Sequence, residues 1–205
     1  MLSKKSPNIS FNKKKCLKKV NFNLILDLDN TIISSLTKEE YTKRKIDPKV
    51  KFTSVCDGLY YTLGRPYLDE FLKYIFQHFN VSVWTAASKD YAIEIIKKYI
   101  IKGNKNRKLK SFLYDVHCKE SIDNINPKTP KDLRYLFSNK KTGYNKDNTV
   151  IIDDLKDVIK YNKKNVIDSE YFDASKKDAL KDIFLLNLIK DLKIVHKFLC
   201  TKNRL

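Results

Sequence analysis

Glycine, proline and long apolar runs are scarce in this sequence. Its 205 residues include only four glycines and five prolines, which is unlike the composition of flexible linkers or collagen-like repeats. No apolar stretch approaches the length of a membrane-spanning helix. The N-terminus also lacks the apolar segment of a secretory signal peptide. We therefore expect a soluble intracellular protein, nuclear or cytoplasmic, with no membrane partner.

Cysteine and histidine are few and scattered. The four cysteines, at positions 16, 56, 118 and 200, form no C-x-x-C pair, and the three histidines show no metal-ligand spacing. This pattern predicts neither a zinc site nor a disulfide framework, and it fits a reducing compartment.

Negative charge is also in short supply. Lys and Arg number 42 against 24 Asp and Glu, a formal net charge of +18. This charge favours acidic partners such as phosphoproteins or nucleic acid. The lysines are spread along the chain, however, and the Lys and Asn bias is also typical of an AT-rich genome, such as that of a parasite or a large virus. Charge alone therefore identifies no partner.

The remaining composition predicts one folded domain, at residues 21–200, after a basic N-terminal arm at residues 1–20. The arm could serve nuclear import or anion binding, or simply be a solvated tail. Strand-like and helix-like patterns alternate within the domain, which is typical of an α/β fold with a central, mainly parallel sheet flanked by helices. An Asp57-Gly58 pair adds a small β-hairpin flap. We expect strands at 22–26, 51–55, 59–63, 81–84, 112–118 and 149–152, and helices at 66–79, 88–101, from 129 onward and at 175–199.

Polar side chains follow three of the apolar strands. Asp27 and Asp29 come directly after the first, Thr85 after the second, and the Asp153-Asp154 pair ends the third. The D-x-D pair alone could be a polar turn. If the three strands are adjacent and parallel, however, all of these side chains converge at the carboxyl edge of the sheet.

Such a group of carboxylates indicates a particular chemistry. Four carboxylates packed together repel one another unless a cation neutralises them, and oxygen ligands without His or Cys suit Mg²⁺. Lys131 follows Thr129-Pro130, which has the sequence of a helix start, and a lysine in a first turn opposes the helix dipole. A lysine and a threonine hydroxyl could instead hold phosphoryl oxygens, which points to phosphoryl transfer with a carboxylate nucleophile.

Five segments resemble the motifs of one enzyme family. Residues 25–31 (ILDLDNT) are similar to the D-x-D-x-T motif of haloacid-dehalogenase-type phosphatases. Residues 65–72 (RPYLDEFL), 84–88 (WTAAS), 131–133 (KDL) and 151–154 (IIDD) resemble, in order, further motifs of one branch of that superfamily. This branch contains the phosphatases of the RNA polymerase II C-terminal domain, also called NLI-interacting-factor-like phosphatases. The resemblance covers residues 22–195.

The resemblance implies a haloacid-dehalogenase-like Rossmannoid fold with a short β insertion, and a role for each site residue. Asp27 would be the nucleophile. Asp29 would protonate the leaving oxygen and later activate water, and its carbonyl would join Asp27 and Asp154 as a Mg²⁺ ligand. Asp153 would hold the metal's water shell or orient Lys131. Thr85 and Lys131 would bind the phosphoryl oxygens, and Lys128 is a rival for the lysine role.

The same resemblance implies a phosphoserine or phosphothreonine protein substrate, such as the RNA polymerase II C-terminal domain. The substrate-reading surface here, with Tyr60, Tyr61 and the basic loop 102–110, matches the family in placement but not closely in residues. Two alternatives stay open: a phosphatase for nucleic-acid ends or small phosphate esters, supported by the positive charge, and an inactive binding module. Asp27 and Asp29 are both present, which argues against the inactive module.

Overall fold

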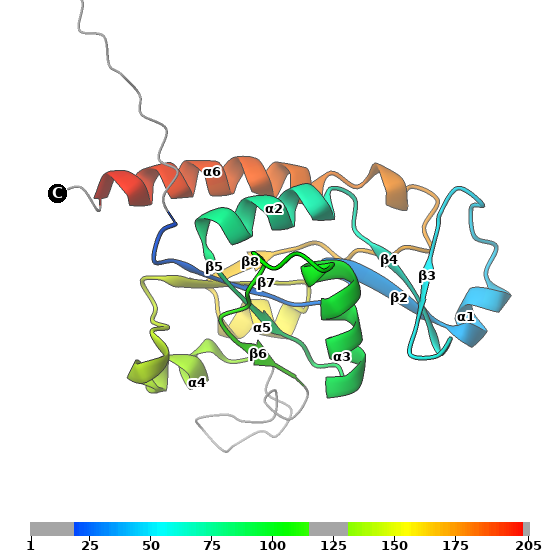
Figure 1. The fold of residues 1–205 in the computed structure, drawn as a ribbon, viewed down its shortest axis with the longest axis horizontal. Coiled ribbons are helices and arrows are strands. Elements are labelled where there is room, and N and C mark those ends of the chain that lie inside the picture. The colour runs from blue at the N-terminus through cyan, green and yellow to red at the C-terminus, as the bar shows by residue number, and fades with distance from the viewer. Residues whose placement is uncertain (1–18, 115–130, 203–205) are drawn as a thin grey trace, which may run out of the picture.

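A five-stranded parallel sheet forms the centre of the molecule (Figure 1). The computed structural model describes residues 19–114 and 131–202. The strand order is β6-β5-β1-β7-β8, and a second, antiparallel sheet has the order β2-β4-β3. The strands are β1 (Asn23–Leu26), β2 (Ile33–Thr37), β3 (Thr53–Val55), β4 (Tyr60–Gly64), β5 (Asn80–Trp84), β6 (Phe112–Leu113), β7 (Thr149–Asp153) and β8 (Val166–Asp168).

Helices cover both faces of the central sheet. Figure 1 shows α2 and α6 side by side on one face, with α4 and α5 on the other. The helices are α1 (Lys38–Lys43), α2 (Leu68–His78), α3 (Lys89–Ile95), α4 (Leu133–Ser138), α5 (Lys156–Tyr161) and α6 (Phe184–Lys202), and a π-helical segment (Ile96–Ile101) continues α3. No helix in the described ranges combines the length and apolarity needed to cross a bilayer.

The central strand β1 is buried because its two faces pack into two different apolar clusters. Leu24 and Leu26 belong to the larger cluster, which includes α2 and α6, whereas Ile25 belongs to a smaller cluster with residues of α4 and α5. This alternation follows the two-residue period of a strand. The continuous apolar run of β1 is thus explained by cover on both faces.

Residues 33–64 form a flap on one side of the sheet (Figure 1). The flap contains β2, α1, β3 and β4. β3 and β4 pair antiparallel around the turn that contains Asp57-Gly58, and β4 also pairs antiparallel with β2. Gly58 lies at φ +86° in this turn, a conformation that costs glycine little. The hairpin predicted from the Asp-Gly pair is therefore present.

The structure confirms the α/β prediction and corrects several of its elements. The polar segment from Ser34 to Lys51, for which the sequence predicted no strand or helix, contains most of β2 and all of α1. α2 begins at Leu68, after a left-handed Tyr67, and not at Pro66. Lys131 lies before α4 and not in its first turn, because Asp132 is the N-cap residue and its side chain accepts from the Arg134 amide. The dipole argument for Lys131 was therefore wrong.

The C-terminal helix also differs from the expectation. It begins at Phe184 and not near 175. Leu180, Ile183 and Phe198 are apolar residues of the predicted helix, and their positions in it predict burial, but they are 48%, 51% and 67% exposed. The residues of α6 that are buried are Leu185, Leu188, Ile189, Leu192, His196 and Cys200.

Some expectations concern residues outside the described ranges. The N-terminal arm falls almost entirely outside them, since only residues 19 and 20 are described. The helix start at Thr129-Pro130, the rival Lys128 and the β insertion beyond residue 114 are also outside.

Candidate active site

The carboxyl ends of three adjacent strands form the floor of the candidate site. β1 pairs with β5 and β7, with Leu26 opposite both Val83 and Ile152. Asp27 therefore leaves the sheet beside Asp153, and its amide donates to the Ile152 carbonyl (3.0 Å). The convergence expected from the sequence is thus a direct result of the parallel register.

Lys131 lies buried between two of these carboxylates. It is 1% exposed, and its Nζ donates to Asp27 Oδ1 and to Asp153 Oδ2 (2.7 Å). Burial opposes the charge of Lys131, but Asp27 and Asp153 outweigh it and raise the pKa of the amine. Lys131 is therefore a fixed positive charge at the bottom of the site.

Asn162 holds the backbone of Lys131 in place. Its Nδ2 donates to the Lys131 carbonyl (3.0 Å), and its Oδ1 accepts from the Leu133 amide (3.0 Å). Asn162 is 6% exposed and ends α5. No sequence motif pointed to this residue, because its role depends on a contact between segments that are distant in the chain.

The Thr31 hydroxyl holds Asp154, and the Ser169 hydroxyl in turn bonds Thr31. Thr31 Oγ1 donates to Asp154 Oδ1 (3.1 Å) and also bonds Ser169 Oγ (3.1 Å). Because the single hydroxyl proton of Thr31 goes to Asp154, Ser169 must be the donor in the second bond. The threonine of the D-x-D-x-T motif therefore orients a carboxylate of the last motif.

Three carboxylates lie close enough to share a cation. One oxygen each of Asp27, Asp153 and Asp154 lie within 4.8 Å of one another. Burial and the charge of Asp27 raise the pKa of Asp153 to about 7 and also raise that of Asp154. One lysine therefore does not neutralise this cluster, and its oxygen-only donor set fits Mg²⁺.

Asp29 lies in a different environment from Asp27. Its Oδ1 accepts a hydrogen bond from the Tyr91 hydroxyl (2.5 Å). Burial raises the pKa of Asp29 to about 6, the Tyr91 hydrogen bond opposes the rise, and Asp27 adds to it. A carboxyl with this pKa can both give and take a proton near neutral pH. Asp29 lines a cavity of about 420 Å³ between the flap and α3. The other lining residues are Asn30, Ser35, Thr37, Tyr60, Ala87, Ser88 and Tyr91.

Thr85 lies where β5 ends and is 1% exposed. Its Oγ1 accepts from the Ala87 amide (3.1 Å), so its side chain also shapes the turn after the strand. The strand register brings Thr85 to the same sheet edge as Asp27.

Arg65 anchors the loop that carries the two aspartates. Its guanidinium is buried and donates to the carbonyls of Thr31 (2.9 Å) and Ser169 (2.7 Å), and bidentately to Asp182 (2.9 and 2.8 Å). The rings of Phe172 and Phe184 lie 5.3 and 4.3 Å from the guanidinium carbon. In the sequence, Arg65 was only part of a segment that resembles a family motif, and the hydrogen bonds show its physical role.

A comparison with protein families identifies this arrangement. Residues 22–199 match the model of the NLI interacting factor-like phosphatases. The chain belongs to this family. Its relatives in the family include the CTD phosphatase-like protein 355R of Invertebrate iridescent virus 6, 38% identical over 172 residues that cover 81% of this chain and 94% of the relative. The corresponding protein of Invertebrate iridescent virus 3 is 34% identical over 177 residues, covering 83% and 94% of the two chains.

The family assignment agrees with a solved structure. The chain resembles Fcp1, titled an essential RNA polymerase II CTD phosphatase, with a TM-score of 0.51 and 23% identity. The match covers 90% of this chain and 53% of the Fcp1 chain, so this chain spans about half of that structure. The fold is therefore haloacid-dehalogenase-like, as the sequence resemblance predicted.

Proposed function

We propose that this protein is a Mg²⁺-dependent phosphatase of phosphoserine and phosphothreonine residues that works through an aspartyl phosphate on Asp27. The observation that carries the proposal is the buried Lys131 between Asp27 and Asp153, beside Asp154. Such a group offers a nucleophile, a positive charge for phosphoryl oxygens and oxygen ligands in one place.

The metal would be held by Asp27, Asp154 and the backbone carbonyl of Asp29, with Asp153 orienting Lys131. Hard oxygen donors and an excess of negative charge over positive charge support this assignment. When bound, Mg²⁺ supplies positive charge that offsets the negative charge of the carboxylates and of the phosphoryl group.

The protein's own residues account for both chemical steps. An oxygen of Asp27 attacks phosphorus, the bond from phosphorus to the serine or threonine oxygen breaks, and Asp29 gives its proton to that oxygen. Asp29, now a carboxylate, then takes a proton from water as the water oxygen attacks the aspartyl phosphate. Phosphate leaves, and Asp27 and protonated Asp29 are restored. Lys131 and Thr85 bind the phosphoryl oxygens throughout.

The names of the relatives support a protein substrate. The viral relatives are called CTD phosphatase-like, and a further relative is a ubiquitin-like domain-containing CTD phosphatase of Xenopus tropicalis. We infer that the RNA polymerase II C-terminal domain is the first substrate to test. The viral relatives also support a large virus as the source of the Lys and Asn bias.

The direct test is hydrolysis of an aryl phosphate by the whole chain, with and without Mg²⁺. We expect Asp27→Asn to lose at least about 10³-fold in kcat/KM, since it removes the nucleophile. Asp57→Asn, the same change at an exposed position of the hairpin turn, should match wild type. Full activity of Asp27→Asn, or activity that EDTA leaves unchanged, would contradict the mechanism.

A second assay separates the substrate classes. Wild type is given phosphorylated heptad peptides of the C-terminal domain, unrelated phosphopeptides and 3′-phosphorylated oligonucleotides. We expect the highest kcat/KM for a phosphopeptide. A preference for the oligonucleotide would instead support the nucleic-acid alternative, for which the net charge of +18 is the main argument.

A further inference from the structure

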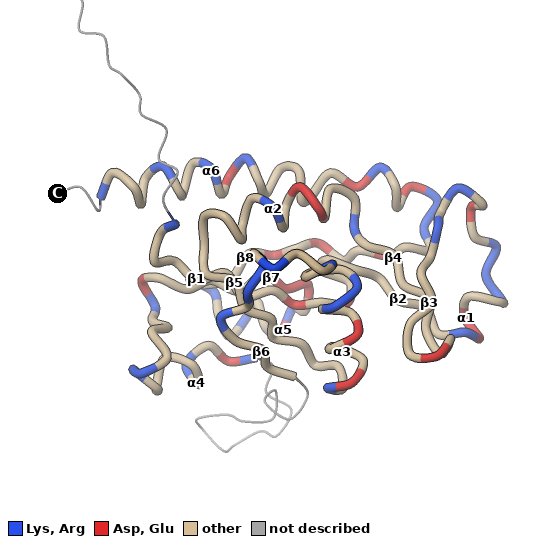
Figure 2. The backbone as a smooth tube through the Cα atoms, viewed as in Figure 1, with Lys and Arg blue, Asp and Glu red and all other residues tan. Residues whose placement is uncertain are grey.

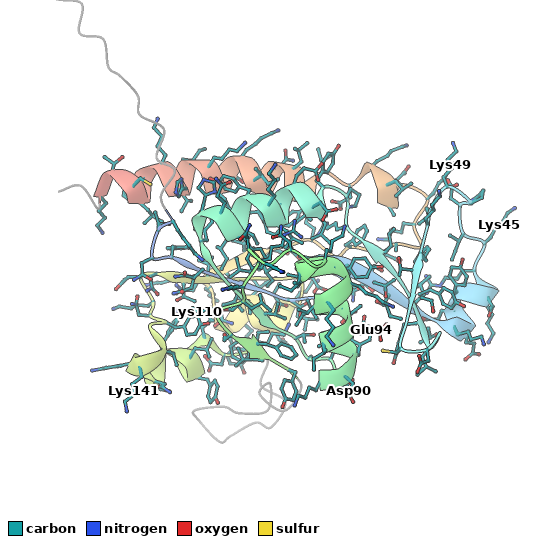
Figure 3. All side chains as sticks on the ribbon, in the orientation of Figure 1. Lys45, Lys49, Asp90, Glu94, Lys110 and Lys141 are labelled. Atoms are coloured by element: carbon teal, nitrogen blue, oxygen red, sulfur yellow. The ribbon has the colours of Figure 1, made fainter. Side chains whose placement is uncertain are left out.

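We propose that Tyr91 is a positioning residue that holds Asp29 in the orientation needed to protonate the leaving oxygen. This inference rests on the proposed function of Asp29. Tyr91 lies in α3 and is 8% exposed, and its hydroxyl donates to Asp29 Oδ1. Its neighbour Asp90 is exposed, and Figure 3 labels it at the N-terminal end of α3. Tyr91 therefore gives α3 a hydrogen bond to the site.

The direction of the hydrogen bonds around Tyr91 is fixed by the number of protons. A tyrosine hydroxyl has one proton, and the Tyr91 proton goes to Asp29. Ser35 Oγ lies 2.6 Å from the Tyr91 hydroxyl, so Ser35 must donate to Tyr91. Thr62 Oγ1, 2.8 Å from Ser35 Oγ, must then donate to Ser35. The three hydroxyls thus form a chain that runs from the flap and ends on Asp29.

This chain decides which oxygen of Asp29 can carry a proton. Since Oδ1 accepts the Tyr91 hydrogen bond, a proton bound to Asp29 resides on Oδ2. Oδ2 is then the oxygen from which the proton would be transferred to the leaving oxygen, while the hydrogen bond from Tyr91 keeps the carboxyl from rotating. Fixing a general acid in one geometry is a recognised source of rate enhancement.

Other contacts already attach the flap to α3 and the π-helical segment that follows. Glu94 accepts from the Cys56 amide (2.9 Å), Lys98 donates to the Ser54 carbonyl (2.8 Å), and the Tyr99 hydroxyl donates to the Thr62 carbonyl (2.7 Å). The Tyr91 ring also packs edge-on against Tyr60, with centroids 5.1 Å apart. The Tyr91 hydroxyl is therefore not needed to hold the flap, and Tyr91→Phe should keep the fold.

The test uses substrates that differ in their need for an acid. A phosphoserine peptide must release a strongly basic oxygen, whereas dinitrophenyl phosphate releases a stable anion and needs no proton. We expect Tyr91→Phe to lower kcat/KM about tenfold or more for the peptide, and less than about threefold for dinitrophenyl phosphate. A purely structural defect would lower both equally, and an equal loss would overturn the proposal.

Three further variants complete the experiment. Tyr99→Phe removes a hydroxyl from the same region without touching Asp29, and it should behave as wild type with both substrates. Ser35→Ala removes the donor to Tyr91, and it should give a smaller loss with the same dependence on the leaving group. In an Asp29→Asn background, Tyr91→Phe should cause no additional loss with dinitrophenyl phosphate.

The outcomes also separate this inference from the proposed function. If Asp27→Asn keeps its activity, the proposed mechanism itself fails. If Asp27→Asn is inactive while Tyr91→Phe loses activity equally on both substrates, only the role of Tyr91 is rejected. A matching loss in Tyr99→Phe would reject it as well.

Discussion

Thr31 links two motifs that are 123 residues apart in the chain. Its hydroxyl donates to Asp154, a proposed metal ligand, and its carbonyl accepts from Arg65. A residue that orients a metal ligand in this way typically changes metal affinity more than chemistry.

Thr31→Val tests this role with little change in volume. We expect the Mg²⁺ concentration for half-maximal activity to rise about tenfold or more, because Asp154 loses its donor. The rate at saturating Mg²⁺ should fall much less. The measurement is a Mg²⁺ titration of aryl phosphate hydrolysis.

Thr149→Val is the matched control. Thr149 is also fully buried, but it lies at the start of β7, at the opposite edge of the sheet. Equal Mg²⁺ dependence in Thr31→Val and wild type would show that the hydroxyl does not act on the metal site.

Single residues could be predicted from the sequence where a motif marks them. Asp27, Lys131 and Asp153 are close together in the structure, as expected, and their roles remain proposals. Asn162 and Ser169 could not be found, because each acts through a hydrogen bond to a segment distant in the chain. Neither hydrogen bond produces a periodic or local pattern in the amino-acid sequence.

At the scale of elements, Arg65 connects the end of β4 to the segment before α6. A buried guanidinium can serve several carbonyls and a carboxylate at once because of its planar set of donors. We expect Arg65→Lys to lower the free energy of unfolding by about 2–4 kcal/mol, since lysine leaves several of these acceptors unpaired. Urea unfolding at fixed pH measures the change.

Arg44→Lys provides the comparison. Arg44 is exposed, and one of its guanidinium nitrogens lies 3.8 Å from Glu40. This variant should stay within about 0.5 kcal/mol of wild type. If both variants unfold at the same urea concentration, Arg65 is not the anchor described here.

The elements themselves were predictable where burial dictates the pattern. β1, β5 and β7 have long apolar runs because both faces are covered. β2 was missed because its serines are polar, and in the structure the Ser34 hydroxyl accepts from the Ala174 amide (3.1 Å). The start of α6 was misplaced because the apolar residues at 180 and 183 suggested helix, whereas both are about half exposed.

At the scale of the whole molecule, charge is distributed unevenly. Figure 2 shows Lys and Arg along α6 and in the loops after α1 and α3. In the acidic cluster of the site, by contrast, Asp27 and Asp153 are buried and Asp154 is partly buried, at the edge of the sheet. Asp29 and Asp153 therefore have pKa values raised to about 6 and about 7 by burial first, with Asp27 adding to the rise.

These raised values predict how stability varies with pH. In the unfolded chain the two carboxyls ionise near pH 4, while in the folded chain they keep their protons to higher pH. The folded state then binds more protons, so stability falls as pH rises between these limits. In EDTA, we expect a lower melting temperature at about pH 8 than at about pH 5, and a larger stabilisation by Mg²⁺ at the higher pH.

Asp153→Asn isolates the source of this dependence. The variant should show a weaker decline of melting temperature with pH in EDTA than Asp57→Asn, which keeps the buried cluster. The expectation fails if the melting temperatures of the two variants decline equally with rising pH.

The Arg65 anchor has a practical consequence for where this domain can be cut. Every residue assigned to the chemistry lies between positions 27 and 154, and a gene trimmed to that interval would look sufficient. Asp182 and Phe184, however, supply the carboxylate and one of the rings that hold Arg65. In such a trimmed chain, the charged guanidinium of Arg65 would lose its carboxylate partner and a ring that packs on it, next to the loop that carries Asp27 and Asp29. The shortest expressible unit must therefore extend into α6, which contributes no side chain to the reaction.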